Sequence, residues 1–283
     1  MVGVGVNADS DKLVLFGHGL TMPARFDLDH GISLESTAPT HNAEELAIGC
    51  GTFADYTAAI VGSGLTSFCI EVREDAGGKS LAAKGWNALW VFHLLSLACQ
   101  APCFPLYSRS SGVRPIYHST NRNIITKPVD ELVLATMNQL HWAKNHKSAF
   151  DSLISCPKFS AGMRCFGNAH YLPDFDMRVM LLWSGIEGLF SVHGELSHRI
   201  ASYAALMFDG SDNEKIAYFS EVKKAYKDRS TAVHGGKRDE NKMKKAYVIS
   251  SLILSRLLAR CVELGRVPTS DELDRLTVLK TVH

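Results

Sequence analysis

The sequence lacks several features that would assign it to a specialised class of protein. Its formal net charge is only +1, so bulk positive charge does not attract it to nucleic acid, and RNA binding would need a local basic patch or one assembled between subunits. The seven cysteines are odd in number and irregularly spaced, which indicates reduced thiols in a cytoplasmic protein rather than a disulfide framework. With 46% hydrophobic and 21% charged residues, the composition is that of a globular protein.

Signals for secretion, membrane insertion and dinucleotide binding are also missing. The first residues carry no basic segment ahead of a long apolar run, so we expect no secretory signal. Residues 86–106 are mostly apolar, but Pro102 and Pro105 interrupt them, and the apolar centre at residues 88–98 is too short to cross a bilayer about 30 Å thick. The glycines within residues 3–5 have no strand before them, so they lack the context of a dinucleotide-binding loop.

The first 125 residues carry mixed signals. Residues 12–16 and 65–72 are rich in β-forming residues and predict strands. A short helix is expected over residues 42–48, and apolar residues at three- and four-residue spacing predict a longer one over residues 82–97. We therefore predict a small α+β domain over residues 1–125, whose role the sequence does not indicate.

Helical signals dominate the remainder of the chain. Helices are predicted over residues 129–144, 148–155, 160–170, 174–193, 195–208, 213–230 and 241–265. The 174–193 segment has the most continuous apolar face, formed by Phe175, Val179, Leu182, Ile186, Leu189 and His193. The 213–230 segment is expected to bury Ile216, Phe219, Val222 and Tyr226. The sequence thus predicts an all-α bundle over residues 126–283.

One stretch at the end of the 213–230 helix combines residue types suited to RNA cleavage. Ser230 follows Arg229 directly, and His234 lies five residues after the arginine. RNA supplies its own nucleophile, the 2′-hydroxyl, so a nuclease of this kind needs neither a metal ion nor a cofactor. A histidine that titrates near neutral pH can move protons, and an arginine can hold the phosphate and stabilise its developing charge. The products would be a 2′,3′-cyclic phosphate and a free 5′-hydroxyl.

The spacing of these two residues does not suit a regular helix. Five residues correspond to roughly 140° around the helix axis, so Arg229 and His234 would not share one face. Either the backbone unwinds near Thr231 and Ala232, or the two residues meet across a dimer interface.

This pattern resembles a known family. Arg229, four residues and then His234 resemble the RxxxxH signature of HEPN ribonucleases, and Tyr226, Ser230 and the paired glycines at 235–236 resemble the Apea-like HEPN group. The resemblance covers residues 128–268. It implies a helical bundle and a homodimer in which two copies of the motif form one composite site for RNA. It also implies a setting in phage defence or in a toxin–antitoxin pair, with an antitoxin or a trigger protein as a further partner.

The resemblance implies roles for two more side chains. Ser230 stands where a polar residue assists the site in this family, and Glu187 stands where the Apea-like group carries a glutamate. We hypothesise that Glu187 orients Arg229 or another cation of the site, because a carboxylate among apolar residues needs a partner. The alternative is that Glu187 faces solvent on the polar side of its helix.

Basic residues near the motif form a candidate RNA-binding patch. We assign Lys227, Lys237 and Arg238 to contacts with the RNA backbone, although a solvated helix surface would have the same composition. The leading hypothesis is a cytoplasmic, metal-independent endoribonuclease with no cofactor, no metal site and no membrane association. One alternative is a non-catalytic HEPN module that binds RNA, a nucleotide or a protein partner, and another is a structural adaptor that assembles through its apolar helical faces.

Overall fold

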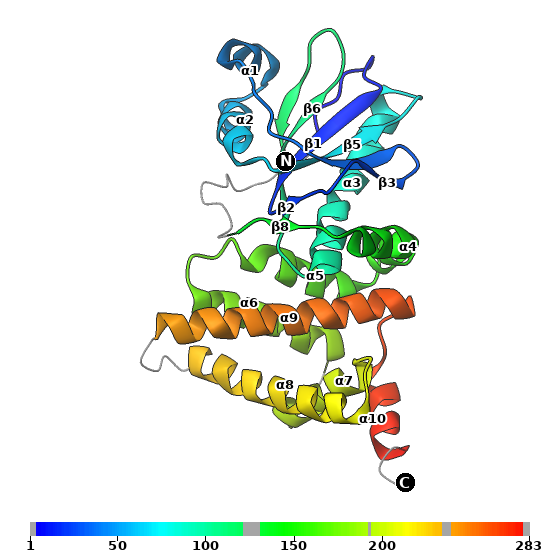
Figure 1. Ribbon diagram of the computed structural model, residues 1–283, viewed down its shortest axis with the longest axis vertical. Helices are drawn as coiled ribbons and strands as arrows, with labels where there is room; N and C mark the ends of the chain where they lie inside the picture. The colour runs from blue at the N-terminus through cyan, green and yellow to red at the C-terminus, as the bar shows by residue number, and fades with distance from the viewer. Residues whose placement is uncertain (1–3, 121–130, 192–193, 234–238, 280–283) are drawn as a thin grey trace. The chain divides into compact units, whose positions relative to one another are not determined.

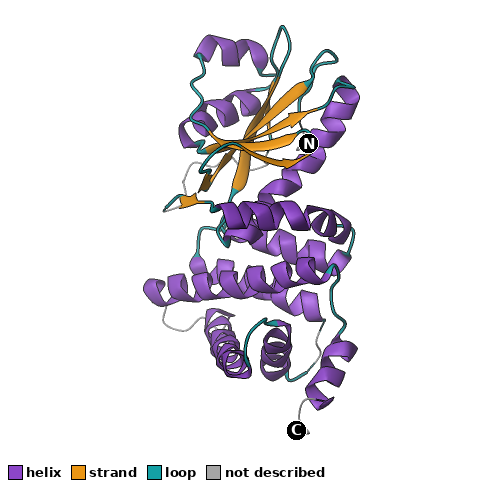
Figure 2. Ribbon diagram, turned by 45° about the vertical axis from the view of Figure 1, so that its right-hand side comes forward, coloured by secondary structure: helices purple, strands orange, loops and turns teal. Residues whose placement is uncertain are grey.

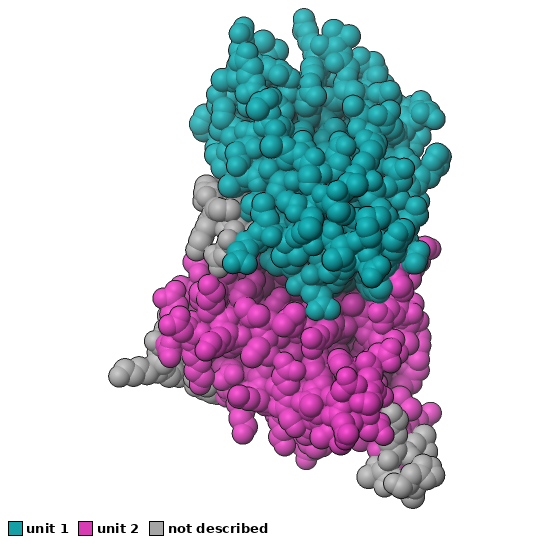
Figure 3. Space-filling view, in the orientation of Figure 1, with its two compact units in different colours: residues 1–145 teal, residues 146–283 magenta. Residues whose placement is uncertain are grey.

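The chain forms two compact units, residues 1–145 and residues 146–283 (Figure 3). The computed structural model describes residues 4–120, 131–191, 194–233 and 239–279. The first unit contains a β-sheet with helices and the second is helical, so the predicted order of an α+β part followed by a helical part is confirmed. The predicted boundary between residues 125 and 126 lies outside the described residues.

The first unit is built on a six-stranded antiparallel sheet (Figure 1). In spatial order the strands are β3 (Phe26–Asp29), β4 (Ile32–Ser36), β5 (Phe68–Arg73), β1 (Lys12–His18), β6 (Phe104–Ser110) and β7 (Tyr117–Ser119). Two short parallel strands, β2 (Leu20–Thr21) and β8 (Val133–Leu134), pair separately. The strands predicted over residues 12–16 and 65–72 are therefore confirmed as β1 and β5, although β5 begins three residues later.

Helices cover both faces of this sheet (Figure 2). The helix α3 (Gly78–Cys99) lies on the face that carries Leu13 and Leu15 of β1, which are fully buried. The helices α1 (Ala43–Gly49) and α2 (Phe53–Leu65) lie on the other side, where Lys12, Val14 and Phe16 of β1 point. Period-two alternation in β1 thus separates an apolar core from a mixed polar face.

The helix α2 and the β3–β4 hairpin are among the elements of this unit that were not predicted from the sequence. The helix α2 buries mainly small residues, Ala58, Ala59 and Gly62, so its apolar periodicity is weak even though Thr52 caps its first turn through Asp55. The sequence of the β3–β4 hairpin is rich in residues typical of turns, but only its tip forms a turn. Gly31 makes this turn possible with a left-handed φ of 70°.

Gly17 allows α3 to approach the sheet closely. A Cβ atom at this position would lie 2.3 Å from Cε1 of Phe92 and 2.9 Å from Cε1 of Phe68. We expect Gly17→Ala to lower the free energy of unfolding by about 1–3 kcal/mol, because an added methyl group in a packed core forces its neighbours to move. Urea denaturation followed by circular dichroism measures this change.

Gly64 provides the matched control for that substitution. It lies in α2, and a Cβ atom there would have no atom within 4 Å. Gly64→Ala should leave the stability unchanged or raise it slightly, because alanine forms helices more readily than glycine. Equal stability of the Gly17→Ala variant and the wild-type protein would contradict the close packing described here.

The helix α4 (Met137–Leu153) corrects the sequence-based prediction of two helices over residues 129–144 and 148–155. It begins later and continues through Asn145 and His146 without a break. Neither residue interrupts a helix in the way that proline or glycine does, and both cost only a few tenths of a kcal/mol relative to good helix formers. The polar pair was therefore a weaker stop signal than the prediction assumed.

The second unit contains the helices α5 (Pro157–Ala169), α6 (Phe175–Phe190), α7 (Leu196–Met207), α8 (Asp212–Val233), α9 (Glu240–Leu264) and α10 (Ser270–Leu279). The helix α6 packs against α5, α8 and α9 (Figure 1). Four residues of its predicted apolar face are fully buried: Val179, Leu182, Ile186 and Leu189. His193, the last residue of that predicted face, lies outside the described residues.

The buried face of α8 agrees with the prediction at Val222 but is otherwise different. Ile216 is 65% exposed, and the buried residues among the described side chains of this helix are Tyr218, Val222 and Ala225. These three recur at steps of four and three, as a helix face requires, so the buried stripe shares Val222 with the predicted one and is turned away from it about the helix axis. Phe219 and Tyr226 therefore lie at the edge of the buried stripe, where they are half-buried.

Candidate functional site

The helix α8 carries the predicted motif up to its last described residue. Its start is fixed by a capping box, in which the Glu214 carboxylate accepts hydrogen bonds from the Ser211 N–H at 2.8 Å and the Ser211 hydroxyl at 2.7 Å. The helix then runs without interruption to Val233, so no unwinding occurs at residues 231–232. The structure therefore does not show the unwound backbone that was one of the two geometries considered for the motif.

Arg229 and Glu187 form an ion pair between α8 and α6. Nη2 of Arg229 lies 3.1 Å from Oε1 of Glu187 and donates a long hydrogen bond of 3.5 Å to Oε2. The side chains are 27% and 25% exposed, so Glu187 does not stand on a solvated polar face. The Oε1 atom is buried and accepts no hydrogen bond within the described part of the chain, which leaves an acceptor beside the guanidinium.

An aromatic layer supports this ion pair. The Tyr226 ring lies beneath Arg229, with 5.5 Å from the guanidinium carbon to the ring centre. Trp183 of α6 meets the Tyr226 ring edge to face at 5.2 Å and donates a 3.0 Å hydrogen bond from Nε1 to Oγ of Ser250 on α9. Trp183 is fully buried. Three helices thus fix the position of the guanidinium, which limits its rotamers before any ligand binds.

The other predicted site residues are described only in part. Ser230 is half-buried and Lys227 is exposed on α8. His234, Lys237 and Arg238 lie outside the described residues. The structure therefore brings Glu187 and Arg229 together, and it gives no position for the histidine of the motif.

Nearby charges moderate the basic patch. Lys242 at the start of α9 pairs with Asp228 of α8, with 3.5 Å between Nζ and Oδ1. Lys223 lies over the Phe219 ring at 5.6 Å, which keeps its charged end near α8. The basic residues Lys223 and Lys242 near the motif are therefore stacked or paired, and they do not extend the patch into a uniform positive surface.

A groove of about 730 Å³ borders the same tyrosine. Residues 194–198, at the start of α7, form one side, and Lys223 and Tyr226 of α8 form the other. Gly194 and Glu195 both adopt left-handed backbone conformations, with φ of 77° and 46°, which turn the chain into α7. The sequence offered no signal for this groove, because its two sides are nearly thirty residues apart and meet only through the packing of α7 on α8.

The ion pair between Arg229 and Glu187 suits the binding of a phosphate group. A guanidinium that pairs with one carboxylate keeps several N–H donors free, and those donors match two oxygens of a phosphate. The partly buried setting strengthens such contacts relative to open solvent.

Two further findings concern the part of the chain that the structure describes. No helix there has the length and apolar character needed to cross a membrane. No cluster of three or more His, Cys, Asp or Glu side chains there is placed to hold a metal ion. The apolar residues 86–106 belong to α3, β6 and the turn that joins them.

Comparisons with known proteins do not assign this chain. No protein-family model, no curated protein and no solved structure matches it.

Proposed function

We propose that the second unit is a HEPN-type endoribonuclease that cleaves RNA without a metal ion. The observation that carries this proposal is the ion pair between Glu187 and Arg229, with Tyr226 beneath the guanidinium. A carboxylate 42 residues earlier in the chain holds the arginine of the RxxxxH pattern in a defined position. Such preorganised donors stabilise charge that develops in a transition state.

In the proposed reaction the RNA 2′-hydroxyl attacks the adjacent phosphorus. The 2′-oxygen loses its proton as the new P–O bond forms, and the 5′-oxygen gains a proton as its bond to phosphorus breaks. His234 is assigned to these proton transfers, because an imidazole can accept and donate protons near neutral pH. Arg229 is assigned to the phosphate, Glu187 to the orientation of Arg229, and Ser230 to a supporting contact.

The proposal includes a dimer. Arg229 and position 234 are separated by roughly 140° if the helical geometry of α8 continues, so one copy of the motif does not present both groups in one direction. Two copies of the chain can supply an arginine from one subunit and a histidine from the other. Lys227, Lys237 and Arg238 are proposed to contact the RNA backbone on either side. A role in phage defence or as a toxin restrained by an antitoxin is part of the same proposal.

Cleavage of single-stranded RNA in the presence of EDTA tests this function. We expect the wild-type protein to release fragments with 2′,3′-cyclic phosphate and 5′-hydroxyl ends, which end-specific enzymatic labelling identifies. His234→Ala should reduce the rate by about 100- to 10,000-fold, the usual contribution of a positioned acid or base.

His30→Ala is the matched control for the histidine substitution. His30 is exposed at the tip of the β3–β4 hairpin, and the proposed reaction assigns it no role, so this variant should cleave RNA at the wild-type rate. The proposal fails if the wild-type protein does not cut RNA, or if His234→Ala cuts as fast as His30→Ala. Binding of RNA without cleavage would favour the non-catalytic module instead.

A further inference from the structure

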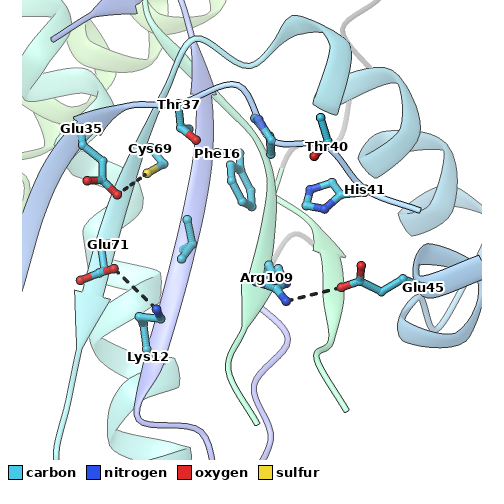
Figure 4. Close-up of a pocket in the computed structure, with 12 residues that line it drawn as sticks. Lys12, Phe16, Glu35, Thr37, Thr40, His41, Glu45, Cys69, Glu71 and Arg109 are labelled. Atoms are coloured by element: carbon cyan, nitrogen blue, oxygen red, sulfur yellow. Dashed lines mark hydrogen bonds and ion pairs between the residues drawn. The ribbon is translucent and has the colours of Figure 1, made fainter. Parts of the chain in front are cut away.

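The first unit has a pocket of about 330 Å³ on the face of the sheet opposite α3 (Figure 4). Strands β1, β5 and β6 form its floor, and the segment between β4 and α1 forms its wall. Most of its lining side chains are polar, whereas small-molecule sites are usually apolar with a few polar groups. The pocket therefore suits a polar ligand.

Two cationic side chains stand next to each other on the pocket floor. Arg109 of β6 is paired in register with Val14 of β1, and Lys12 precedes Val14 by two residues on the same face. Such diagonal neighbours lie about 7–8 Å apart, which is close enough for both to contact one anionic group. Their side chains are 41% and 37% exposed, so a ligand can reach them.

The carboxylate nearest to Lys12 is already occupied by closer cations. Glu71 lies 2.8 Å from Nε of Arg73 and 3.0 Å from Nη2 of Arg25, but 3.8 Å from Nζ of Lys12. Burial raises the pKa of Glu71, yet the hydrogen bonds from the two arginines outweigh this effect and lower it overall. Glu71 is shared among three cations and Lys12 is the most distant of them, so this ion pair neutralises the charge of Lys12 only in part.

Arg109 is likewise only partly engaged by its neighbouring carboxylate. Oε1 of Glu45 accepts a 2.5 Å hydrogen bond from the Tyr117 hydroxyl and lies 3.4 Å from Nη2 of Arg109. The Nε atom of Arg109 is buried and has no hydrogen-bond partner among the described residues. Burial lowers the pKa of the nearby His41, which favours the neutral form of this imidazole. Arg109 therefore retains donors for a ligand.

The opposite rim offers groups that recognise hydroxyls. Figure 4 shows Glu35, Thr37 and Thr40 across the pocket from Lys12 and Arg109, with Phe16 between the two sides. Glu35 is 39% exposed, and its carboxylate lies 3.5 Å from Nη1 of Arg25 and accepts a weak 3.9 Å hydrogen bond from the Cys69 thiol. A carboxylate accepts hydrogen bonds and threonine hydroxyls both donate and accept them, which suits a ligand with several hydroxyl groups.

We propose that this pocket binds a small phosphorylated sugar. The phosphate would lie on Lys12 and Arg109, and the hydroxyls would face Glu35, Thr37 and Thr40. The volume of about 330 Å³ is near the lower end of the range for small-molecule sites, in keeping with a sugar phosphate. This proposal is independent of RNA cleavage, because it concerns only residues of the first unit and its test measures binding.

Isothermal titration calorimetry of the full chain tests the pocket. The ligands are ribose 5-phosphate, glucose 6-phosphate, ribose, inorganic phosphate and adenosine monophosphate. We expect at least one sugar phosphate to bind tenfold or more tightly than ribose and inorganic phosphate. Lys12→Ala and Arg109→Ala should each weaken that binding by about tenfold or more, because each removes a charged hydrogen-bond donor.

Lys79→Ala is the matched control, since Lys79 is an exposed lysine in the first turn of α3. It should bind like the wild-type protein, and thermal unfolding of each variant separates a lost ligand contact from a lost fold. No binding of either sugar phosphate, or equal affinity in the Lys12→Ala, Arg109→Ala and Lys79→Ala variants, would overturn the proposal. Adenosine monophosphate binding more than tenfold tighter than both sugar phosphates would also overturn it, in favour of a nucleotide site.

Discussion

Replacing Arg229 by alanine is expected to slow RNA cleavage by about 100- to 1000-fold, the cost of removing one preorganised donor to a developing charge. The guanidinium is the proposed contact for the phosphate, and Glu187 holds it 3.1 Å away. Arg229→Lys should recover only part of the rate, because lysine keeps the charge but not the planar pair of donors. Single-turnover cleavage of a labelled RNA at saturating protein measures this effect.

The role of Glu187 can be separated from that of a residue that only stabilises the fold. If Glu187 acts by orienting Arg229, Glu187→Gln should lower the single-turnover rate by roughly tenfold, yet add little to the defect of Arg229→Ala. Two substitutions in one interacting pair are non-additive, whereas independent ones add. Arg164→Ala provides the control, since Arg164 is exposed on α5. Full additivity of the two changes, or an Arg229→Ala variant as active as Arg164→Ala, would contradict these assignments.

Among the substitutions proposed here, truncation of the Trp183 side chain is expected to cause the largest loss of stability. Trp183 is fully buried, touches Tyr226 and hydrogen bonds to Ser250. Trp183→Ala is expected to lower the free energy of unfolding by about 3–5 kcal/mol, the usual cost of truncating a buried tryptophan. Chemical denaturation measures this loss directly.

A second pair of variants isolates the hydrogen bond. Trp183→Phe keeps most of the ring volume but leaves the buried Ser250 hydroxyl without its donor, which costs about 1–3 kcal/mol. Adding Ser250→Ala removes the unsatisfied group, so the double variant should be more stable than Trp183→Phe alone. If the double variant is less stable than Trp183→Phe, the lost hydrogen bond to Ser250 does not account for the stability lost in Trp183→Phe.

Much of the helical unit could be predicted because its helices have long apolar faces. The steps of three and four residues in α6 place Val179, Leu182, Ile186 and Leu189 in the core, and periodicity of this kind needs no knowledge of the partner. The prediction failed for Ile216, which is 65% exposed. Apolar residues flank both sides of the stripe in α8, so only the packing of the other helices decides which row is buried.

The candidate site could also be predicted only in part. A motif spacing drew attention to Arg229, and the cost of burying an unpaired carboxylate drew attention to Glu187. Nothing local in the sequence indicated that Trp183 and Ser250 would support them, because these residues are 67 positions apart and meet only in the folded bundle. The pocket formed by Lys12 and Arg109 was missed for the same reason, since the register between β1 and β6 creates it.

The position of β1 in the sheet determines when this strand can pair with both of its neighbours during synthesis. β1 lies between β5 and β6, and its partner residues extend to Arg73 on one side and Ser110 on the other. At about 5–20 residues per second, roughly 5–20 seconds separate the synthesis of β1 from that of β6. During this interval the apolar side chains Leu13, Leu15 and Phe16 have no completed sheet to join. A chaperone that binds short apolar segments would find its target there, before the helical unit has been made.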